Sequence, residues 1–148
     1  MMQLGIAVPT YQQHARRESI LEVALKADEL EFDSIWIPDH IVTGGTVLPR
    51  LGPVWFEPFV VYSYIAALTT RVRLGLAVLV VPYRHPVFTA KLVSTLDQLS
   101  GGRVILGVGS GGDVKVELDS MSISHADRGP MTDEYLRAMK ALWAEGFE

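Results

Sequence analysis

Four short apolar runs divide the chain into segments of similar length. They cover Leu4 to Val8, Ser34 to Ile37, Leu74 to Val81 and Arg103 to Val108. Because apolar and β-branched residues follow one another there with little alternation, the runs predict strands that are covered on both faces. We therefore expect an α/β fold built on a parallel sheet.

Helical spacing follows each of the first three runs. Apolar residues recur at three- and four-residue steps from Glu18 to Glu31, from Pro58 to Thr69 and from Pro86 to Ser100, which predicts three helices. Proline in the first turn and glycine after the last turn are typical of such helices. The side chains expected to face inward are Phe59, Tyr62, Ile65, Ala66 and Leu68 in the second helix and Phe88, Leu92, Leu96 and Leu99 in the third.

The segment after the fourth run has a weaker pattern. Residues 113–127 alternate without a clear stop, so a loop, a short helix and an excursion all remain open. Beyond this segment, Thr132 is the expected N-cap of a last helix that runs to about Glu145 and Gly146.

The predicted order is βαβαβαβα, which implies parallel pairing with right-handed crossovers. Two architectures fit: an open doubly wound sheet, or part of a βα barrel. A complete barrel of eight units needs about 250 residues, whereas this chain has 148. If the chain forms a barrel, it is the N-terminal (β/α)4 half of one, a single truncated domain over residues 1–148. Its first and last strands then have unpaired edges, and we expect a homo-oligomer.

Composition narrows the range of partners. A hydrophobic fraction of 49% and a charged fraction of 20% indicate a globular domain. The net charge is −4 and no basic cluster is longer than Arg16-Arg17, so neither nucleic acid nor a membrane is an expected partner. The absence of cysteine excludes disulfides and thiolate chemistry. The sequence shows neither the pattern of a secretory signal nor an apolar run near the ~20 residues of a membrane helix, and we expect a cytoplasmic location.

Polar residues gather where the predicted strands end. In both architectures, ligands bind at the carboxyl ends of parallel strands. The residues at the four strand exits are Thr10 and Tyr11; Asp39 and His40; Tyr83, Arg84 and His85; and Ser110, Gly111 and Gly112. We expect a site for a small-molecule substrate among them.

His40 is the candidate for proton transfer, because imidazole titrates near neutral pH. Asp39 beside it could favour the charged form of His40 or orient a ligand, and a histidine packed in the following loop is the alternative. His85 is expected to anchor the start of a helix rather than to act in catalysis. Arg84 could pair with a phosphate or a carboxylate, or remain a solvated charge. No metal site is expected, since no ligand spacing typical of one is present.

Two further segments bear on this site. Residues 41–57 mix proline and glycine with large apolar side chains, which favours either a loop that covers a pocket or a loop that packs on its own body. Gly107, Gly109 and Gly112 formally match GxGxxG, but no following strand with a terminal acidic residue is evident, so the dinucleotide motif is weak. Such glycines would still let a flat ring or a phosphate approach the backbone.

Three stretches carry a resemblance to a known family: SIWIPDH from Ser34, VPYRHPVFTAKLVSTLDQLSGGRVILGVGSGG from Val81, and RGPMTDEYLRAMKALW from Arg128. With them the chain resembles the bacterial luciferase-like monooxygenases. The resemblance implies a TIM-type barrel and an oxidoreductase or monooxygenase that acts on a small organic substrate. It also implies a cofactor, with the deazaflavin coenzyme F-420 as the first expectation and FMN as the alternative.

The resemblance assigns individual residues. Asp39 and His40 match the family's catalytic pair, His40 as acid or base and Asp39 orienting the ring. The positions that match cofactor-binding residues are Asp39, Ala77, Val78, Ser110, Gly111 and Gly112. A non-prolyl cis bond between Ala77 and Val78 is expected to back the ring. The family usually has an aromatic residue where Gly112 stands, and its following acidic pair is reduced here to Glu117.

Three hypotheses follow for the function. The first is a flavin- or deazaflavin-dependent oxidoreductase. The second is a catalytically inactive half barrel that self-associates or binds flavin without turnover. The third is a doubly wound domain that binds a nucleotide at Gly107 to Gly112, and a first strand in the middle of the sheet would support it.

Overall fold

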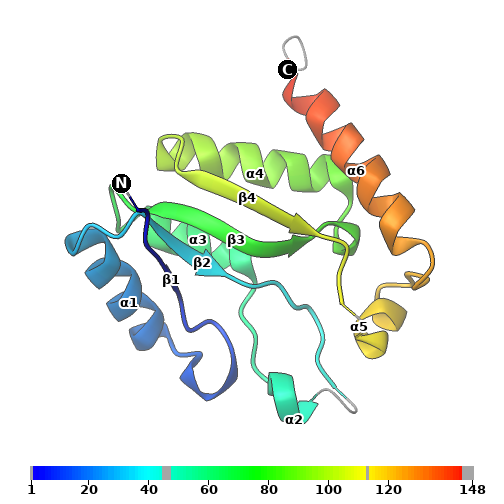
Figure 1. Ribbon diagram of the computed structural model, residues 1–148, viewed down its shortest axis with the longest axis horizontal. Helices are drawn as coiled ribbons and strands as arrows, with labels where there is room; N and C mark the ends of the chain where they lie inside the picture. The colour runs from blue at the N-terminus through cyan, green and yellow to red at the C-terminus, as the bar shows by residue number, and fades with distance from the viewer. Residues whose placement is uncertain (1, 45–47, 113, 145–148) are drawn as a thin grey trace.

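The computed structural model describes residues 2–44, 48–112 and 114–144. Its centre is a parallel sheet of four strands in the order β1-β2-β3-β4 (Figure 1). The strands are β1 Gly5–Ala7, β2 Ser34–Ile37, β3 Arg73–Val80 and β4 Val104–Gly109. The predicted parallel α/β architecture is therefore confirmed.

The order of the strands separates the two architectures. Each strand pairs with the next one along the chain, so that Gly5 aligns with Ser34, and Ser34 aligns with Arg73. β1 consequently lies at an edge of the sheet, not in its middle. Strands in sequential order are typical of a βα barrel, whereas the doubly wound alternative is wrong for this chain.

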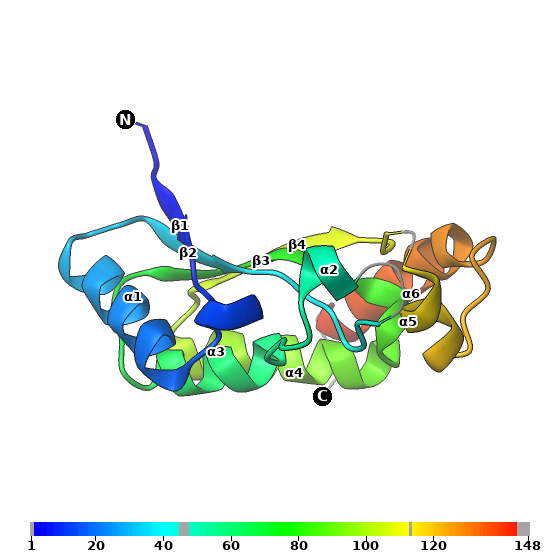
Figure 2. The ribbon, with the colours of Figure 1, turned by 90° about the horizontal axis from the view of Figure 1, so that it is seen from below.

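Four longer helices connect or follow the strands: α1 Arg17–Glu29, α3 Pro58–Ala66, α4 Pro86–Ser100 and α6 Arg128–Trp143. The shorter elements are η1 Gln12–His14, α2 Leu48–Leu51, η3 Val81–Tyr83 and α5 Lys115–Ser120. Figure 2 shows α1, α3 and α4 on one side of the sheet, while within the described ranges no helix covers the other side. None of the described helices has the length and apolarity needed to cross a bilayer.

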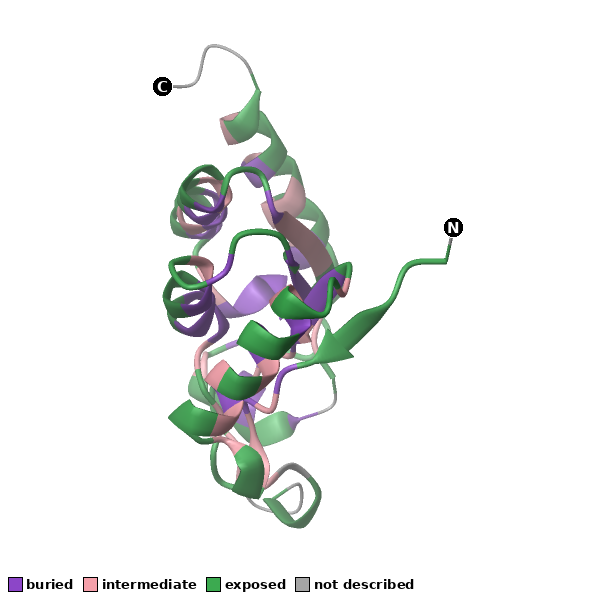
Figure 3. Cartoon of the chain, turned by 90° about the vertical axis from the view of Figure 1, so that its left-hand side faces the viewer, coloured by how far each residue is buried: buried purple, intermediate pink, exposed green. Residues whose placement is uncertain are grey.

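The main core lies between the sheet and the covered side. Ile35 and Leu74 are fully buried there, as is Tyr62 of α3. Figure 3 shows the buried parts of the chain in purple on the strands and on the helices packed against them. The Tyr62 hydroxyl donates to two strand carbonyls, with its oxygen 3.0 Å from the Ile35 oxygen and 2.5 Å from the Gly75 oxygen. Burial raises the pKa of Tyr62, which keeps the hydroxyl protonated as a donor. This side chain thus ties α3 to both central strands.

A tryptophan occupies the opposite face. Trp36 of β2 lies across both neighbouring strands, because a Cβ atom on either Gly5 or Gly75 would overlap its indole ring. Its Nε1 donates to the Ser34 hydroxyl at 2.9 Å. Glycine in β1 and β3 therefore makes the room that this indole needs.

The inward stripe predicted for α4 is wrong at its ends. Phe88 is 64% exposed and Leu99 is 81% exposed. The helix instead buries a neighbouring stripe of smaller residues, including Thr89, Ala90 and Val93 together with the correctly predicted Leu96. Both stripes have helical spacing, and the smaller side chains permit a closer approach to the sheet. In the same way Leu68, beyond the end of α3, is exposed.

The last helix starts earlier than predicted. α6 begins at Arg128 after its N-cap Asp127. Thr132 lies inside the helix, and its hydroxyl donates to the Arg128 carbonyl at 2.6 Å. The end predicted near residues 145 and 146 lies outside the described residues.

Arg103 holds the amino end of β4. Its side chain is buried and donates only to neutral oxygens, at distances between 2.7 and 3.1 Å. These acceptors are the carbonyls of Ser100, Val72, Ala66 and Thr69 and the hydroxyl of Thr69. Burial lowers the pKa of Arg103. The guanidinium therefore joins α3, α4 and the entry to β3 at the end of the sheet opposite the strand exits.

Candidate functional site

A cavity of about 750 Å³ lies at the carboxyl ends of the strands. Its lining includes all seven residues that the family resemblance assigns: Asp39, His40, Ala77, Val78, Ser110, Gly111 and Gly112. The other residues expected at the strand exits, Thr10, Tyr11, Tyr83, Arg84 and His85, do not line it. They come from the exits of β2 and β4 and from within β3. The structure thus brings together residues that are far apart in the sequence, in a volume typical of small-molecule sites.

The floor of the cavity is built from β3 and β4. The Ala77-Val78 peptide bond is cis, as the family resemblance implied. A Cβ atom on Gly109 would lie 2.7 Å from Val78 Cγ2, so glycine there lets the valine pack against β4. Val78 nevertheless remains 40% exposed. Together these residues form an apolar surface against which a flat ring can lie.

The glycine turn after β4 forms the wall beside that floor. Gly111 has a φ of 86°, a conformation that favours glycine. A Cβ atom on Gly112 would have no atom of the described residues within 4 Å, so this position opens into free space. Arg128 of α6 fixes the turn, since its Nη1 donates to the Gly111 and Gly112 carbonyls at 2.8 and 2.9 Å. Arg128 therefore fixes the turn, while Gly111 and Gly112 remain accessible from the cavity.

Asp39 is buried in an ion pair with Arg84. Arg84 donates through Nη1 and Nη2 to the two carboxylate oxygens at 2.7 and 2.8 Å, and the Val80 amide donates to Oδ2 at 3.0 Å. Arg84 also contacts Glu57 at 2.9 Å. Burial would lower the pKa of Arg84, but the bond to Asp39 outweighs it and raises the pKa. Of the alternatives for Arg84, pairing with a carboxylate is the one observed, and the carboxylates are the protein's own.

His40 is bonded to a different carboxylate. Its Nδ1 lies 2.9 Å from Oε2 of Glu117, whose side chain is fully buried. The hydroxyl of Tyr83 donates to the same oxygen at 2.8 Å. The other oxygen accepts from the amides of Ile41 and Val42. Glu117 therefore connects the exits of β2, β3 and β4.

The surroundings set the ionisation of this cluster. Burial would raise the pKa of Glu117, but the hydrogen bonds from His40, from the backbone and from Tyr83 outweigh it and hold the pKa below its ordinary value. Burial raises the pKa of Tyr83, and its bond to the Glu117 carboxylate raises it further. Glu117 is thus an anion and Tyr83 a neutral donor near neutral pH.

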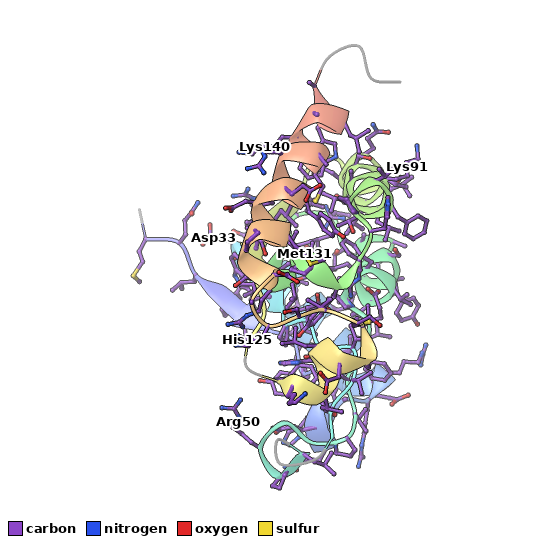
Figure 4. All side chains as sticks on the ribbon, turned by 90° about the vertical axis from the view of Figure 1, so that its right-hand side faces the viewer. Asp33, Arg50, Lys91, His125, Met131 and Lys140 are labelled. Carbon is purple, nitrogen blue, oxygen red and sulfur yellow. The ribbon has the colours of Figure 1, made fainter. Side chains whose placement is uncertain are left out.

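The described parts of the loop of residues 41–57 line the site and pack on the body of the protein. Trp55 stacks on Tyr11, with ring centroids 4.5 Å apart, and packs on the His40 ring in a T-shaped arrangement, with centroids 4.4 Å apart. The Phe56 amide donates to the Thr10 carbonyl at 2.9 Å. Arg50 of α2 lines the cavity, and Figure 4 shows it extending to the same side as the amino-terminal strand. Both interpretations of this loop therefore hold in part.

The remaining histidines lie outside the cavity. His14, His85 and His125 are exposed, and none of them lines it. The prediction that His85 anchors α4 through its side chain is wrong, since that side chain forms no capping bond with the described residues; its carbonyl accepts from Thr89 instead. In the described ranges, no cluster of histidine and acidic residues could hold a metal ion.

Sequence reasoning missed four contributions to the site: Glu117 as the partner of His40, Tyr83 as a second donor to Glu117, Trp55 as the packing surface of His40, and Arg128 as the support of the glycine turn. A signal existed for Glu117. It lies between the apolar residues Val116 and Leu118, and a carboxylate buried beside them needs hydrogen-bond partners.

Comparison with known proteins identifies the relatives of this chain. The profile of the family described as luciferase-like monooxygenase matches residues 2–148. An uncharacterized protein of Mycobacterium tuberculosis is 40% identical over 131 residues, which cover 80% of this chain and 46% of that protein. An F420-dependent glucose-6-phosphate dehydrogenase of Amycolatopsis mediterranei is 34% identical, over 75% of this chain and 32% of its own length. The chain thus spans less than half the length of these curated relatives.

Solved structures agree on the fold. A monooxygenase from Streptomyces bottropensis superposes with a TM-score of 0.81 at 28% identity, over 97% of this chain and 44% of its own. The oxygenating constituent of 3,6-diketocamphane monooxygenase from Pseudomonas putida, in complex with FMN, gives a TM-score of 0.79 at 23% identity, over 96% of this chain and 39% of its own. The four βα units described above are shared with these larger enzymes.

Proposed function

This chain belongs to the family of luciferase-like monooxygenases. We propose that it functions as a flavin- or deazaflavin-dependent oxidoreductase that acts on a small organic substrate. One observation carries the proposal: the seven residues that the family resemblance assigns to such a site line a single cavity. The cavity, the apolar floor and the open glycine turn fit a flat ring.

We propose coenzyme F-420 as the first choice of cofactor and FMN as the alternative. Support for the deazaflavin comes from relatives at 32–34% identity that are named F420-dependent glucose-6-phosphate dehydrogenases. Support for FMN comes from the complex of the Pseudomonas putida enzyme, which shares the fold. A bound cofactor of this kind supplies hydride transfer or oxygen activation, while the protein supplies position and protons.

The residues divide this work. Val78 would back a bound ring, and Ser110, Gly111 and Gly112, which line the same cavity, would help to hold it. His40 exchanges a proton with the substrate, since it lines the cavity and keeps a 21% exposed side chain. Asp39 accepts a hydrogen bond from the Val80 amide and so fixes the end of β3, which forms part of the cavity floor.

Titration of the purified chain with F-420 and with FMN tests this proposal. We expect quenching of cofactor fluorescence with at least one of them, at a stoichiometry of one cofactor per site. No spectral change with either cofactor would overturn the proposal for this chain. Oxidation of candidate small alcohols or ketones by the loaded protein then addresses the substrate.

A second candidate function is a half barrel that assembles with another copy and binds flavin without turnover. It is supported by the apolar side chains exposed at the first strand, where Leu4 before β1 is 52% exposed and Ile6 in β1 is 37% exposed. Two copies would supply eight strands, the number in a closed barrel of this type. Light scattering distinguishes the states: a dimer supports this assembly and a stable monomer contradicts it.

A further inference from the structure

Glu117 reaches His40 from α5, a short helix in the segment that follows β4 and the glycine turn. Its carboxylate is saturated: Oε1 accepts from two backbone amides, and Oε2 lies within hydrogen-bond distance of both His40 Nδ1 and the Tyr83 hydroxyl. The amide bonds prevent the carboxylate from rotating away, because both amides belong to the segment that directly follows His40. The two side chains are therefore held in one relative orientation.

The donors around the carboxylate decide the direction of the bond to His40. An ionised carboxylate is only an acceptor, and the Tyr83 hydroxyl and two N–H groups already point at it. Nδ1 must therefore carry the proton of this hydrogen bond. A neutral imidazole has one N–H, so Nε2 is then left with its lone pair.

The position of the His40 ring determines where the Nε2 lone pair can point. His40 lines the cavity, and Trp55 packs edge to face against the ring at 4.4 Å. Nε2 lies on the far side of the ring from Glu117, and no hydrogen bond among the described residues uses it. The nitrogen that is free to exchange a proton is thus the one that Glu117 does not hold.

We propose that Glu117 is the positioning residue of this site, which fixes neutral His40 as the Nδ1–H tautomer and leaves Nε2 as a proton acceptor toward the cavity. The role of Nε2 in turnover rests on the proposed function, whereas the tautomer does not. Glu117 acts through His40, and Tyr83 helps to hold the carboxylate by donating to the same oxygen.

The test is nitrogen NMR of the purified chain with isotope-labelled histidine, above the ordinary titration range of imidazole. The signals of His40 are assigned by their loss in a His40→Asn variant. We expect a protonated Nδ1 and an unprotonated Nε2 for His40. A protonated Nε2 in the unmodified protein would overturn the proposal without any variant.

Glu117→Gln provides the sharper comparison. A carboxamide has one acceptor oxygen and one NH₂ group, so it cannot serve both the amide pair and the side-chain pair. With its oxygen on the backbone amides, its NH₂ group faces His40, which can accept only through Nδ1. We expect the His40 tautomer to switch to Nε2–H in this variant, and an unchanged tautomer would contradict the proposal.

Tyr83→Phe is the matched control, since it removes the other donor to Oε2 and leaves the carboxylate in place. We expect the Nδ1–H tautomer to persist in it, and a switch there would assign the role to Tyr83 instead. If Glu117→Gln does not fold, the unmodified protein and Tyr83→Phe still decide the question. Failure to bind any cofactor would reject the proposed function but would leave this tautomer result intact.

Discussion

Asp39 and Arg84 form a bidentate ion pair, with nitrogen–oxygen distances of 2.7 and 2.8 Å, at the edge of the cavity. The Asp39 side chain is fully buried and that of Arg84 is 12% exposed. Asp39, which precedes His40 in the sequence, is therefore paired with Arg84. The carboxylate that contacts His40 comes from Glu117, far away in the sequence. The site thus contains two carboxylates with separate partners.

Loss of the Arg84 guanidinium should be strongly destabilising. Arg84→Ala leaves the buried Asp39 carboxylate without its cation, and breaking such a pair costs about 3–5 kcal/mol. Glu57→Gln is the matched control, because Glu57 is the more exposed partner at 37% and an exposed pair contributes about 0–1 kcal/mol. Urea unfolding measures both. Equal losses of unfolding free energy in the two variants would contradict this account.

The stability contributed by Asp28 should depend on pH. Its carboxylate accepts from the backbone amides of Thr70, Arg71 and Val72 at the entry to β3. Burial would raise the pKa of Asp28, but these bonds outweigh it and lower the pKa. A lowered folded-state pKa means that the stabilisation is present above the unfolded value, near 3.9, and is lost as the pH falls through the lowered value.

We therefore expect Asp28→Asn to lower the free energy of unfolding by roughly 1–2 kcal/mol at neutral pH. The difference from the unmodified protein should shrink in acid, below the unfolded-state pKa. Urea unfolding at pH 7 and at about pH 3 measures this difference in the free energy of unfolding. Asp119→Asn, on an exposed face of α5, is the control for the loss of a negative charge. A difference that is the same at both pH values would refute the prediction.

Arg103→Lys should destabilise the amino end of the sheet. Lysine offers three donors on one nitrogen and cannot reach the spread of carbonyls that the guanidinium serves. Buried acceptors left without donors cost about 1–3 kcal/mol. Arg73→Lys on β3, where the side chain is exposed, should change the free energy of unfolding by less than about 0.5 kcal/mol. A shift of similar size in both variants would show that the buried contacts of Arg103 are unimportant.

A methyl group at Gly75 should clash with Trp36. The Cβ atom of Gly75→Ala would overlap the indole, and overpacking of this kind costs about 1–3 kcal/mol. Trp36→Ala removes the obstacle, so the loss in the double variant should be smaller than the sum of the two single losses. Thermal unfolding of the four proteins of this cycle checks it, and simple additivity would argue against the contact.

The sequence predicted local structure well where a single feature decides it. Ser34 to Ile37 is predicted and observed with the same bounds, because the run is apolar and is followed by proline. The α4 stripe failed because two helical stripes compete in one sequence, and contact with the sheet selects the one with smaller residues rather than Phe88 and Leu99.

The sequence predicts which residues lie at the site but not which hydrogen bonds they form. Strand exits converge in any parallel sheet, so Asp39, His40 and Ser110 could be placed together in advance. The partner of His40 lies 77 residues away along the chain, in a segment without a clear periodic pattern. Which of several carboxylates meets an imidazole depends on tertiary geometry, and periodicity carries no information about it. The cis bond was expected only through the family resemblance.

The most direct test of the central claim is the affinity for F-420 and FMN of a chain whose floor has been altered. Val78→Asp places a carboxylate under the proposed ring, and Val60→Asp makes the same change on α3 at a valine that is 69% exposed and outside the cavity. We expect the unmodified protein and Val60→Asp to bind a cofactor equally well, and Val78→Asp to bind it at least about tenfold more weakly, since burying an unpaired charge opposes binding. Equal binding by both variants, or no binding by the unmodified chain, would contradict the account.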